Sequence, residues 1–271
     1  MESSGNLAND PLWREMLETG FLGDFPVSYR DVVDSTNVIA MDMARSGAPT
    51  GTVVVAGSQT SGKGRLGRKW LSPPGSGLYF SIILRPRLAL DDLSRITLAA
   101  GVAVCQALEA TTGLSPRLKW PNDLLLNGKK FCGILTETAG ISSPDSIPVI
   151  VGIGMNVLNA KSSMPADLQG KVTSLFEEGE TVYGKGVLLE ECVARVLGQV
   201  DVLEKGDFNA IIREFDRRDA IKGKHCYWLT PAGAVVSGVS LGVDERGVLH
   251  IRDNQGRVSE VISGDINQKK P

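Results

Sequence analysis

Apolar residues recur three or four positions apart in five segments, a spacing typical of amphipathic helices. The clearest runs over residues 91–112, where two acidic residues open the segment and Gly113 follows its last apolar turn. Side chains that commonly cap helices, Asp10 and either Ser35 or Thr36, precede the first two segments. The five predicted helices cover residues 10–20, 35–46, 91–112, 185–204 and 207–218.

Short runs of β-branched and apolar residues predict strands between these helices. One pair of runs flanks Asn127-Gly128, a dipeptide that strongly favours a two-residue hairpin turn. Because most of the strands follow one another through hairpins, the pattern favours an α+β fold over a doubly wound parallel sheet. The predicted strands cover residues 52–56, 78–84, 117–120, 124–126, 131–137 and 148–157.

The pattern changes after Lys222, where short β runs alternate with turns and helical periodicity ends. This spacing predicts a small β-barrel-like module of about 50 residues and a boundary near residue 220. The runs cover residues 225–229, 235–243, 248–252 and 258–262, and the turns cover 231–233, 245–247 and 254–256.

Composition narrows the class of protein. With 42% hydrophobic and 22% charged residues among 271, the chain is of ordinary globular type. Four scattered cysteines without a C-x-x-C pair argue against a disulfide scaffold and a zinc site. His225 and His250 lie too far apart to suggest a histidine metal centre or a Ser-His-Asp relay. Apolar runs too short for a bilayer and a polar start without a leader pattern make the cytoplasm the expected location.

One tract departs from this average. Residues 43–90 contain no Asp or Glu but hold seven cations, and the rest of the chain has 22 Lys and Arg against 31 Asp and Glu. This distribution indicates a local anion site rather than a nucleic-acid-binding protein. Four of the cations fall in residues 57–70, GSQTSGKGRLGRKW, here called the glycine-basic loop. We expect the other three, Arg45, Arg85 and Arg87, on solvated surface or at the mouth of the site.

The glycine-basic loop partly matches two nucleotide-binding motifs. Gly57 to Lys63 fits G-x-x-x-x-G-K, but the hydroxyl residue that should follow is Gly64, and a Pro-Gly-rich stretch replaces the required helix. Gly62, Gly64 and Gly67 fit G-x-G-x-x-G, but the expected opening helix and the acidic residue about 20 positions on are missing. Both motifs are therefore rejected.

What remains is a glycine-rich loop that carries Lys63, Arg65, Arg68 and Lys69. Glycine lets backbone approach an anion closely, and arginine offers forked donors to phosphate oxygens. Because like charges repel, we expect the loop to be disordered when empty and ordered by an anionic ligand. The alternative is a plain solvated basic loop, which leaves the regular glycines before Trp70 unexplained.

Three further segments carry candidate chemistry. KWPND (119–123) places a cation, an aromatic ring and a carboxylate at a strand end, and hairpin pairing would bring Lys130 beside Asp123. Taken alone, this segment is better explained as a capped turn with exposed lysines. GIGMN (152–156) closes an apolar strand with glycines that mark a close backbone approach. DSTN (34–37) is either a plain helix cap or a helix start with donors that face a ligand.

The order of these segments is more informative than any one of them. DSTN, Q-x-x-G-x-G-R-x-G-R-x-W, KWPND, K-x-x-G-I-L-x-E, G-I-G-x-N and a C-terminal β module resemble the biotin protein ligases, from about residue 28 to 268. The resemblance implies a class II synthetase-like α+β domain with a mixed, mostly antiparallel sheet and flanking helices, followed by a small SH3-like β-barrel. It divides the chain into a helical lead-in (1–27), a catalytic biotin- and ATP-binding domain (28–220) and the β-barrel (221–271).

The resemblance also implies a two-step reaction in the cytoplasm. Biotin and Mg²⁺-ATP give biotinyl-5′-AMP and pyrophosphate, and a lysine of a biotin carboxyl carrier domain, of acetyl-CoA carboxylase or a related carboxylase, then takes the biotin. Adenylation joins two anions, so cations must offset their repulsion. No protein nucleophile and no metal ligand of the protein is needed, which fits the absence of a triad in the sequence.

The resemblance assigns roles to matching positions. The residues expected to bind biotin are Ser35, Thr36, Asn37, Gln59, Lys63, Gly64, Arg65, Lys130 and Gly133. Those expected to bind ATP or the adenylate are Arg65, Arg68, Trp70, Lys119 and Asn156. The residues expected to be catalytic are Arg65, Lys119, Asp123 and Lys130.

Two positions depart from the family pattern. Lys63 stands where many relatives have arginine, which keeps the charge but loses the forked geometry. Leu66 stands where a cation is also common, so retention of the adenylate could differ. Some relatives begin with a winged helix-turn-helix. Because only about 30 residues precede DSTN here, we expect no operator DNA binding by this form and no membrane partner.

Two alternatives stay open from the sequence. The first keeps the fold and changes the acid, giving a lipoate or octanoate ligase or transferase. The second is a biotin-sensing binding protein without catalysis. The complete glycine-basic loop together with KWPND favours the biotin ligase over both. A homodimer formed through a sheet edge is possible for the family, and the sequence does not decide it.

Overall fold

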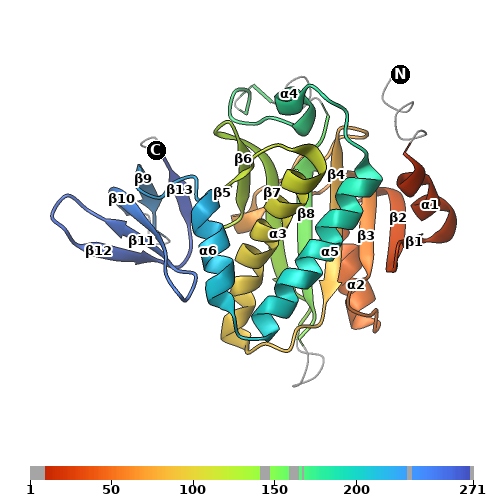
Figure 1. Cartoon of the computed structure of the whole chain (residues 1–271), viewed down its shortest axis with the longest axis horizontal. Helices are drawn as coiled ribbons and strands as arrows, with labels where there is room; N and C mark the ends of the chain where they lie inside the picture. Colours follow the sequence, from red (N-terminus) through yellow and green to blue (C-terminus); the bar gives the residue numbers. More distant parts are fainter. Residues whose placement is uncertain (1–9, 141–146, 159–164, 167, 231–233, 269–271) are drawn as a thin grey trace.

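A computed structural model describes residues 10–140, 147–158, 165–166, 168–230 and 234–268. Its centre is an eight-stranded sheet with the order β1-β2-β3-β4-β8-β7-β6-β5 (Figure 1). Neighbouring strands are antiparallel except β2 and β3, which are parallel. The strands are β1 (Phe21–Leu22), β2 (Phe25–Val33), β3 (Val53–Gln59), β4 (Gly77–Leu84), β5 (Arg117–Lys119), β6 (Asp123–Leu126), β7 (Lys129–Thr138) and β8 (Val149–Asn156).

Helices cover the two faces of this sheet unequally. Figure 1 shows α3, α5 and α6 side by side over one face, and the short helix α2 lies on the other. The helices are α1 (Pro11–Thr19), α2 (Thr36–Arg45), η2 (Arg65–Gly67), η3 (Leu90–Ser94), α3 (Arg95–Thr112), α4 (Leu175–Gly179), α5 (Lys185–Glu204) and α6 (Phe208–Arg218). The predicted α+β class and the mixed, mostly antiparallel sheet are confirmed.

Burial on both faces explains the uninterrupted apolar runs of the central strands. Val53 and Val55 of β3 belong to the larger core under α3 and α5, whereas Val54 packs on the α2 side with Ala40 and Ala44. A strand covered on both sides has no solvent face, so its sequence does not alternate. Because α2 is short, part of the sheet's second face is left for a functional site.

The helix formed by η3 and α3 is the central core element. Over Leu90–Thr112 it is long and apolar enough to cross a membrane by length and composition alone, although the sequence analysis expected no such segment. In the structure, 67% of its most apolar window is buried inside the protein, and its neighbours are α5, α6 and the sheet. Burial in the core accounts for its hydropathy.

The C-terminal segment forms a second sheet with the order β12-β11-β10-β9-β13, all antiparallel. The strands are β9 (His225–Leu229), β10 (Val235–Val243), β11 (Leu249–Arg252), β12 (Val258–Val261) and β13 (Asp265–Asn267). The predicted turn at 231–233 lies outside the described residues. The predicted antiparallel module is confirmed, while its closure into an SH3-like barrel and the domain limits at 27 and 220 stay predictions.

All four cysteines are reduced and buried. Burial raises the pKa of each thiol, that of Cys192 to about 12. They pack as small apolar side chains, because burial outweighs the neighbouring cations that would stabilise a thiolate.

Candidate functional site

The N-terminus of α2 forms one wall of the site. Ser35 is its N-cap, with no side-chain capping bond, and Ser35, Thr36 and Asn37 are all buried. The Oε1 atom of Gln59, at the end of β3, accepts hydrogen bonds from the Thr36 backbone N–H (2.8 Å) and from the Thr36 hydroxyl (3.2 Å). Gln59 therefore does at the helix start what a capping side chain usually does.

A serine in β4 extends this wall into a polar network. Ser81 is fully buried and lies 2.8 Å from the Thr36 hydroxyl and 2.6 Å from Asn37 Oδ1. Asn37 Nδ2 donates to Glu137 Oε2 at 2.7 Å, and Gln59 Nε2 donates to Ser72 Oγ at 2.8 Å. Sequence reasoning missed Ser81, Ser72 and Glu137. The available signal for Ser81 was a small polar residue in the apolar run of β4.

Two glycines of β8 make room for the side chains on this face. A Cβ atom added at Gly152 would lie about 2.0 Å from Asn37 Oδ1, and one at Gly154 would lie about 2.4 Å from Trp70 Nε1. Real Cβ atoms do not come that close to other atoms. The glycines of GIGMN are thus explained by close approach of Asn37 and Trp70 to the strand.

The glycine-basic loop is a narrow hairpin in this structure. Its two arms are joined by backbone bonds from Trp70 N to Gly62 O (2.8 Å) and from Gly64 N to Arg68 O (2.7 Å), and η2 forms its tip. Leu66, at the tip, has a φ of 55° and is 66% exposed. The expectation that an anion orders this loop concerns a bound state and stays a prediction.

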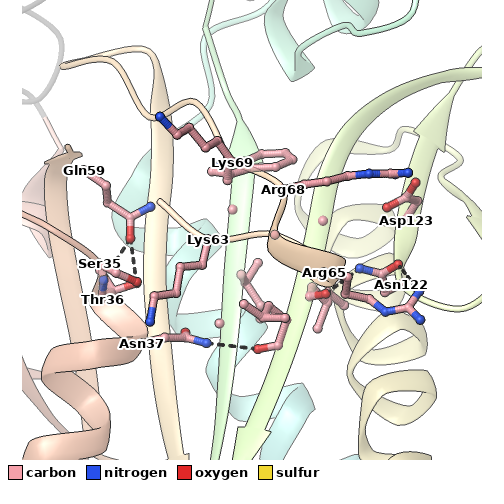
Figure 2. Close-up of a pocket in the computed structure, with 18 of the residues that line it drawn as sticks. Ser35, Thr36, Asn37, Gln59, Lys63, Arg65, Arg68, Lys69, Asn122 and Asp123 are labelled. Atoms are coloured by element: carbon pink, nitrogen blue, oxygen red, sulfur yellow. Dashed lines mark hydrogen bonds between the residues drawn. The ribbon is translucent and has the colours of Figure 1, made fainter. Parts of the chain in front are cut away.

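The cationic side chains of the loop lie over the large sheet. Figure 2 shows Lys63 extending toward Asn37 and Arg65 turning toward Asn122, whose Oδ1 accepts from Arg65 Nη1 at 3.3 Å. Burial lowers the pKa of Arg65, and the neighbouring Asp123 opposes that shift. An arginine stays charged under such shifts, so a permanent cation is held at the pocket.

The predicted hairpin brings KWPND and Lys130 together. Lys130 Nζ lies 2.5 Å from Asp123 Oδ1 and 5.3 Å from the centre of the Trp70 ring. The expectation that antiparallel pairing would place Lys130 beside Asp123 is confirmed. Asn122 holds the turn in place, because its Nδ2 donates to Ile134 O at 2.7 Å.

Lys119 pairs with Asp123 across β5 and β6 and is half-buried. Burial lowers its pKa below the ordinary 10.5, Asp123 opposes this effect, and Lys130 and Arg68 add to it. Asn156, at the end of β8, is also buried and donates from Nδ2 to Thr173 O at 3.0 Å.

Two adjoining pockets collect nearly all predicted site residues. The first pocket is lined by Ser35, Thr36, Asn37, Gln59, Lys63, Gly64, Arg65, Arg68, Lys69, Trp70, Asn122, Asp123, Lys130, Gly133, Ile134, Leu135, Gly152, Ile153 and Gly154. The second pocket is lined by Arg68, Lys69, Trp70, Leu71, Lys119, Asp123, Leu125, Gly128, Lys130, Asn156, Leu168, Lys171, Val172, Ile221 and Gln268. Five residues line both pockets and so lie where the two meet: Arg68, Lys69, Trp70, Asp123 and Lys130.

Every residue expected to bind biotin lines the first pocket, and Arg68, Trp70, Lys119 and Asn156 line the second. Of these two pockets, Arg65 lines only the first. Within the described residues, no group of three or more His, Cys, Asp or Glu side chains could hold a metal ion. The arrangement can hold two ligands end to end, with cations at their junction.

The second pocket also receives residues from outside the large sheet. Ile221 follows α6, and Gln268 follows β13 of the C-terminal sheet. The Trp120 indole of KWPND donates from Nε1 to Gly247 O in the turn between β10 and β11, at 3.1 Å. The C-terminal sheet is therefore connected to the site directly.

Comparison with known proteins places this architecture. The sequence profile of the Biotin/lipoate A/B protein ligase family matches residues 29–156. Over 252 residues the chain is 37% identical to the bifunctional ligase/repressor BirA of Bacillus subtilis strain 168. This alignment covers 92% of this chain and 76% of BirA. It is 33% identical over 231 residues to a biotin--[acetyl-CoA-carboxylase] ligase of Paracoccus denitrificans, and this alignment covers 83% of this chain and 93% of that ligase. The chain belongs to the biotin protein ligase family.

A solved biotin protein ligase has the same fold. The Aquifex aeolicus enzyme in complex with biotin and ATP superimposes with a TM-score of 0.76 at 30% identity, covering 89% of this chain and 97% of that one. Members of this family are enzymes. The predicted relationship to the biotin protein ligases is confirmed.

Proposed function

We propose that this chain is an ATP-dependent ligase that forms biotinyl-5′-AMP and transfers biotin to a lysine of a biotin carboxyl carrier domain. The observation that carries the proposal is the meeting of two pockets where Asp123 and Lys130 face Arg68, Lys69 and Trp70 of the glycine-basic loop. A site that must join two substrates needs them end to end with their reacting groups at a common boundary.

The first pocket suits biotin. Biotin has a neutral bicyclic head that carries one carbonyl and two N–H groups, and a flexible acid tail. Ser35, Thr36 and Asn37 offer hydroxyl and amide groups for the head, and the pocket is otherwise lined in part by Ile134, Leu135 and glycines. Placed head first, the acid tail would reach the Lys130 end.

The second pocket suits ATP. Arg68, Lys119 and Lys130 provide positive charge for phosphates, and Asn156 and Trp70 provide a polar edge and an aromatic face for the base. In the proposal Mg²⁺ enters as the metal–ATP complex, held by phosphate oxygens. When bound, Mg²⁺ would lower the negative charge of the phosphates.

The first step joins the two substrates. An oxygen of the biotin carboxylate attacks the α-phosphorus of ATP, the bond to the bridging oxygen breaks, and pyrophosphate leaves. Lys119, Lys130 and Arg65 offset the repulsion between the two anions and stabilise negative charge as it develops. The Asp123 carboxylate holds the Lys130 ammonium at 2.5 Å, which fixes that cation at the junction.

The second step uses the carrier lysine. Its neutral ε-amine attacks the carbonyl carbon of the mixed anhydride, AMP leaves with the bonding electrons, and the nitrogen loses a proton to form the amide. Until then the anhydride must be kept from water. The glycine-basic loop, with Arg65 on its inner side, would serve as this cover. We place the reaction in the cytoplasm, with a carboxylase carrier domain as partner.

Pyrophosphate exchange tests the proposal. The chain is incubated with Mg²⁺-ATP and labelled pyrophosphate, in parallel with biotin, lipoate, octanoate or no acid. Biotin-dependent exchange, followed by biotin transfer to an added carrier domain, is the expected result. Exchange with lipoate or octanoate but not biotin would contradict the proposal in favour of a related acyl ligase. Biotin binding without exchange would indicate a sensor.

A further inference from the structure

A segment outside every predicted motif organises the second pocket. Residues 168–174, here called the strap, run between the second pocket and α4, and Leu168, Lys171 and Val172 line that pocket. Thr173, the next residue, is completely buried. It does not itself line either pocket, so a direct contact with a ligand does not explain it.

The strap fixes the backbone of Lys130. The Lys130 N–H donates to Lys171 O at 3.0 Å, and the Thr173 N–H donates to Lys130 O at 2.9 Å. On the opposite side, the pairing of β6 with β7 has a register shift between Leu124 and Leu125, the latter paired with Lys130. The regular ladder is interrupted there, and the strap satisfies both backbone groups of Lys130.

The strap also sets the direction of the Asn156 side chain. Thr173 O accepts from Asn156 Nδ2 at 3.0 Å. Since a carbonyl oxygen can only accept, the amide nitrogen must face Thr173, and this settles which end of the amide is which. Among the described residues Asn156 Oδ1 accepts no hydrogen bond, which leaves it available as an acceptor in a residue that lines the second pocket.

Thr173 is held by a second layer of contacts. Its hydroxyl donates to Glu178 Oε1 at 2.5 Å, and the other oxygen of Glu178 accepts from Asn127 Nδ2 at 2.5 Å. Asn127 occupies the turn between β6 and β7. Glu178 lies in α4, which begins with Ser174 as a side-chain N-cap. The carboxylate thus ties the strap to the hairpin that carries Asp123 and Lys130.

We infer that Thr173, anchored by Glu178, is a positioning residue that aims Asn156 Oδ1 at the base of the nucleotide. An acceptor at that place pairs with the exocyclic amine of adenine, whereas guanine presents the O6 acceptor at the equivalent position. Thr173 therefore confers preference for ATP over GTP without touching either. The inference rests on the proposed function for the reaction but predicts nucleotide binding by itself.

The test compares Thr173→Val, which removes the hydroxyl and keeps the shape, with Thr173→Ser, which restores it. Thr112→Val is the matched control, because the Thr112 hydroxyl also donates a hydrogen bond, to Leu108 O, but lies in α3 away from the pocket. In biotin-dependent pyrophosphate exchange, Thr173→Val should raise KM for ATP by about tenfold, as loss of one buried hydrogen bond allows. KM for biotin and kcat should change little, because the backbone bonds of the strap to Lys130 are kept in Thr173→Val. The preference for ATP over GTP should fall.

Thr173→Ser should recover most of the ATP affinity, and Thr112→Val should leave both KM values unchanged. In an Asn156→Ala background, Thr173→Val should have a smaller effect on ATP, because the two residues act in one chain of contacts. An unchanged KM for ATP, equal losses for ATP and biotin, or additive effects in the double variant would each overturn the inference.

Calorimetry with a non-hydrolysable ATP analogue separates this inference from the proposed function. If the wild-type chain shows no exchange with biotin, the proposed reaction fails. Weaker binding of the analogue by Thr173→Val than by Thr173→Ser would still support the positioning role. Equal binding by the two variants would overturn it even in a chain that ligates biotin.

Discussion

Seven cations share one acid-free tract of the sequence, but their surroundings divide six of them into two groups, and the seventh, Arg87, is exposed. Arg85 donates to Ala44 O and Ala48 O at the end of α2, and Arg45 donates to Ala139 O. These two stabilise the fold rather than merely occupying solvated surface, as had been expected. The four cations of the glycine-basic loop line the pockets instead. Charge along a sequence therefore located the pockets but could not tell an arginine that bonds backbone carbonyls from one that lines a pocket.

Arg65 provides the sharpest test of the loop as a cover. Arg65→Gly removes the cation held near Asn122 and should release the adenylate early, because a charged donor to phosphate contributes about 1.5–3 kcal/mol. Biotin labelling of an unrelated protein, such as serum albumin, should rise about tenfold or more relative to wild type. Arg87→Gly, at an exposed position outside the site, is the control. Unaltered selectivity in Arg65→Gly would exclude the loop as the cover.

Lys119 should give the reaction a pH limit. Burial lowers its pKa below 10.5. In the free enzyme the Lys119 side chain therefore loses its proton, and its positive charge, at a lower pH than an ordinary lysine does. We expect kcat/KM for ATP to fall as pH rises through that lowered pKa. Lys119→Arg should move the fall to higher pH, because a guanidinium stays protonated. Lys205→Arg, at an exposed ion pair, is the control and should leave the pH profile unchanged. If Lys119→Arg has the same pH profile as wild type, the loss of activity at high pH belongs to another group.

Strand β8 shows how an element can be shaped by what lies on it. The side chains on one face of β8 are large and apolar and belong to the main core. The other face carries Gly152 and Gly154, which lie beneath Asn37 and Trp70. β-Strand propensity disfavours glycine, so its presence twice in the centre of a sheet is a requirement of the site.

Gly154→Ala should therefore damage the site more than the fold. The new methyl group would displace the Trp70 ring, a strain of about 1–3 kcal/mol, and should lower kcat/KM for adenylation by about tenfold or more. Gly198→Ala is the control, because no atom lies within 4 Å of a Cβ added at that position in α5. It should leave activity intact and raise stability by up to about 1 kcal/mol. Full activity of Gly154→Ala would show that Trp70 can move freely.

Elements with strong local signals were predicted well, and those that depend on distant pairing were missed. The helix at 185–204 and the hairpin at Asn127-Gly128 were predicted at their observed positions. The strand β2 was not, because it pairs in parallel with β3 across α2 and its exposed polar residues break the apolar pattern. The role of Thr173 was not predicted for a similar reason. Its partners Lys130 and Asn156 lie in other segments of the chain, and no motif contains it.

Across the whole molecule, the C-terminal sheet is attached to the reaction centre rather than only following it in sequence. Trp120 lies within KWPND, yet its indole donates to Gly247 in the far sheet. Gln268 and Ile221 complete the second pocket from the same side. Adjacency in space, which the sequence did not reveal, gives this sheet a direct route to influence what the second pocket binds.

Trp120→Phe should loosen this attachment. Loss of the bond to Gly247 O removes about 1 kcal/mol and should raise hydrogen exchange in residues 244–248 several-fold while increasing KM for ATP. Trp228→Phe is the matched control, because the Trp228 indole donates within its own sheet, to Ser263 O at 2.8 Å. It should destabilise the C-terminal sheet by a similar amount with a smaller effect on KM for ATP. Equal effects of the two variants on KM would mean that general loosening, not this contact, matters.

Because every cysteine is buried, the native chain should react little with thiol-specific reagents. With each thiol raised in pKa and shielded from solvent, alkylating reagents should modify the folded protein slowly and the unfolded protein fully. A single new thiol at the exposed loop tip, Leu66→Cys, would then accept a fluorophore alone among five cysteines. Such a labelled chain could report opening and closing of the glycine-basic loop in real time during each half of the reaction.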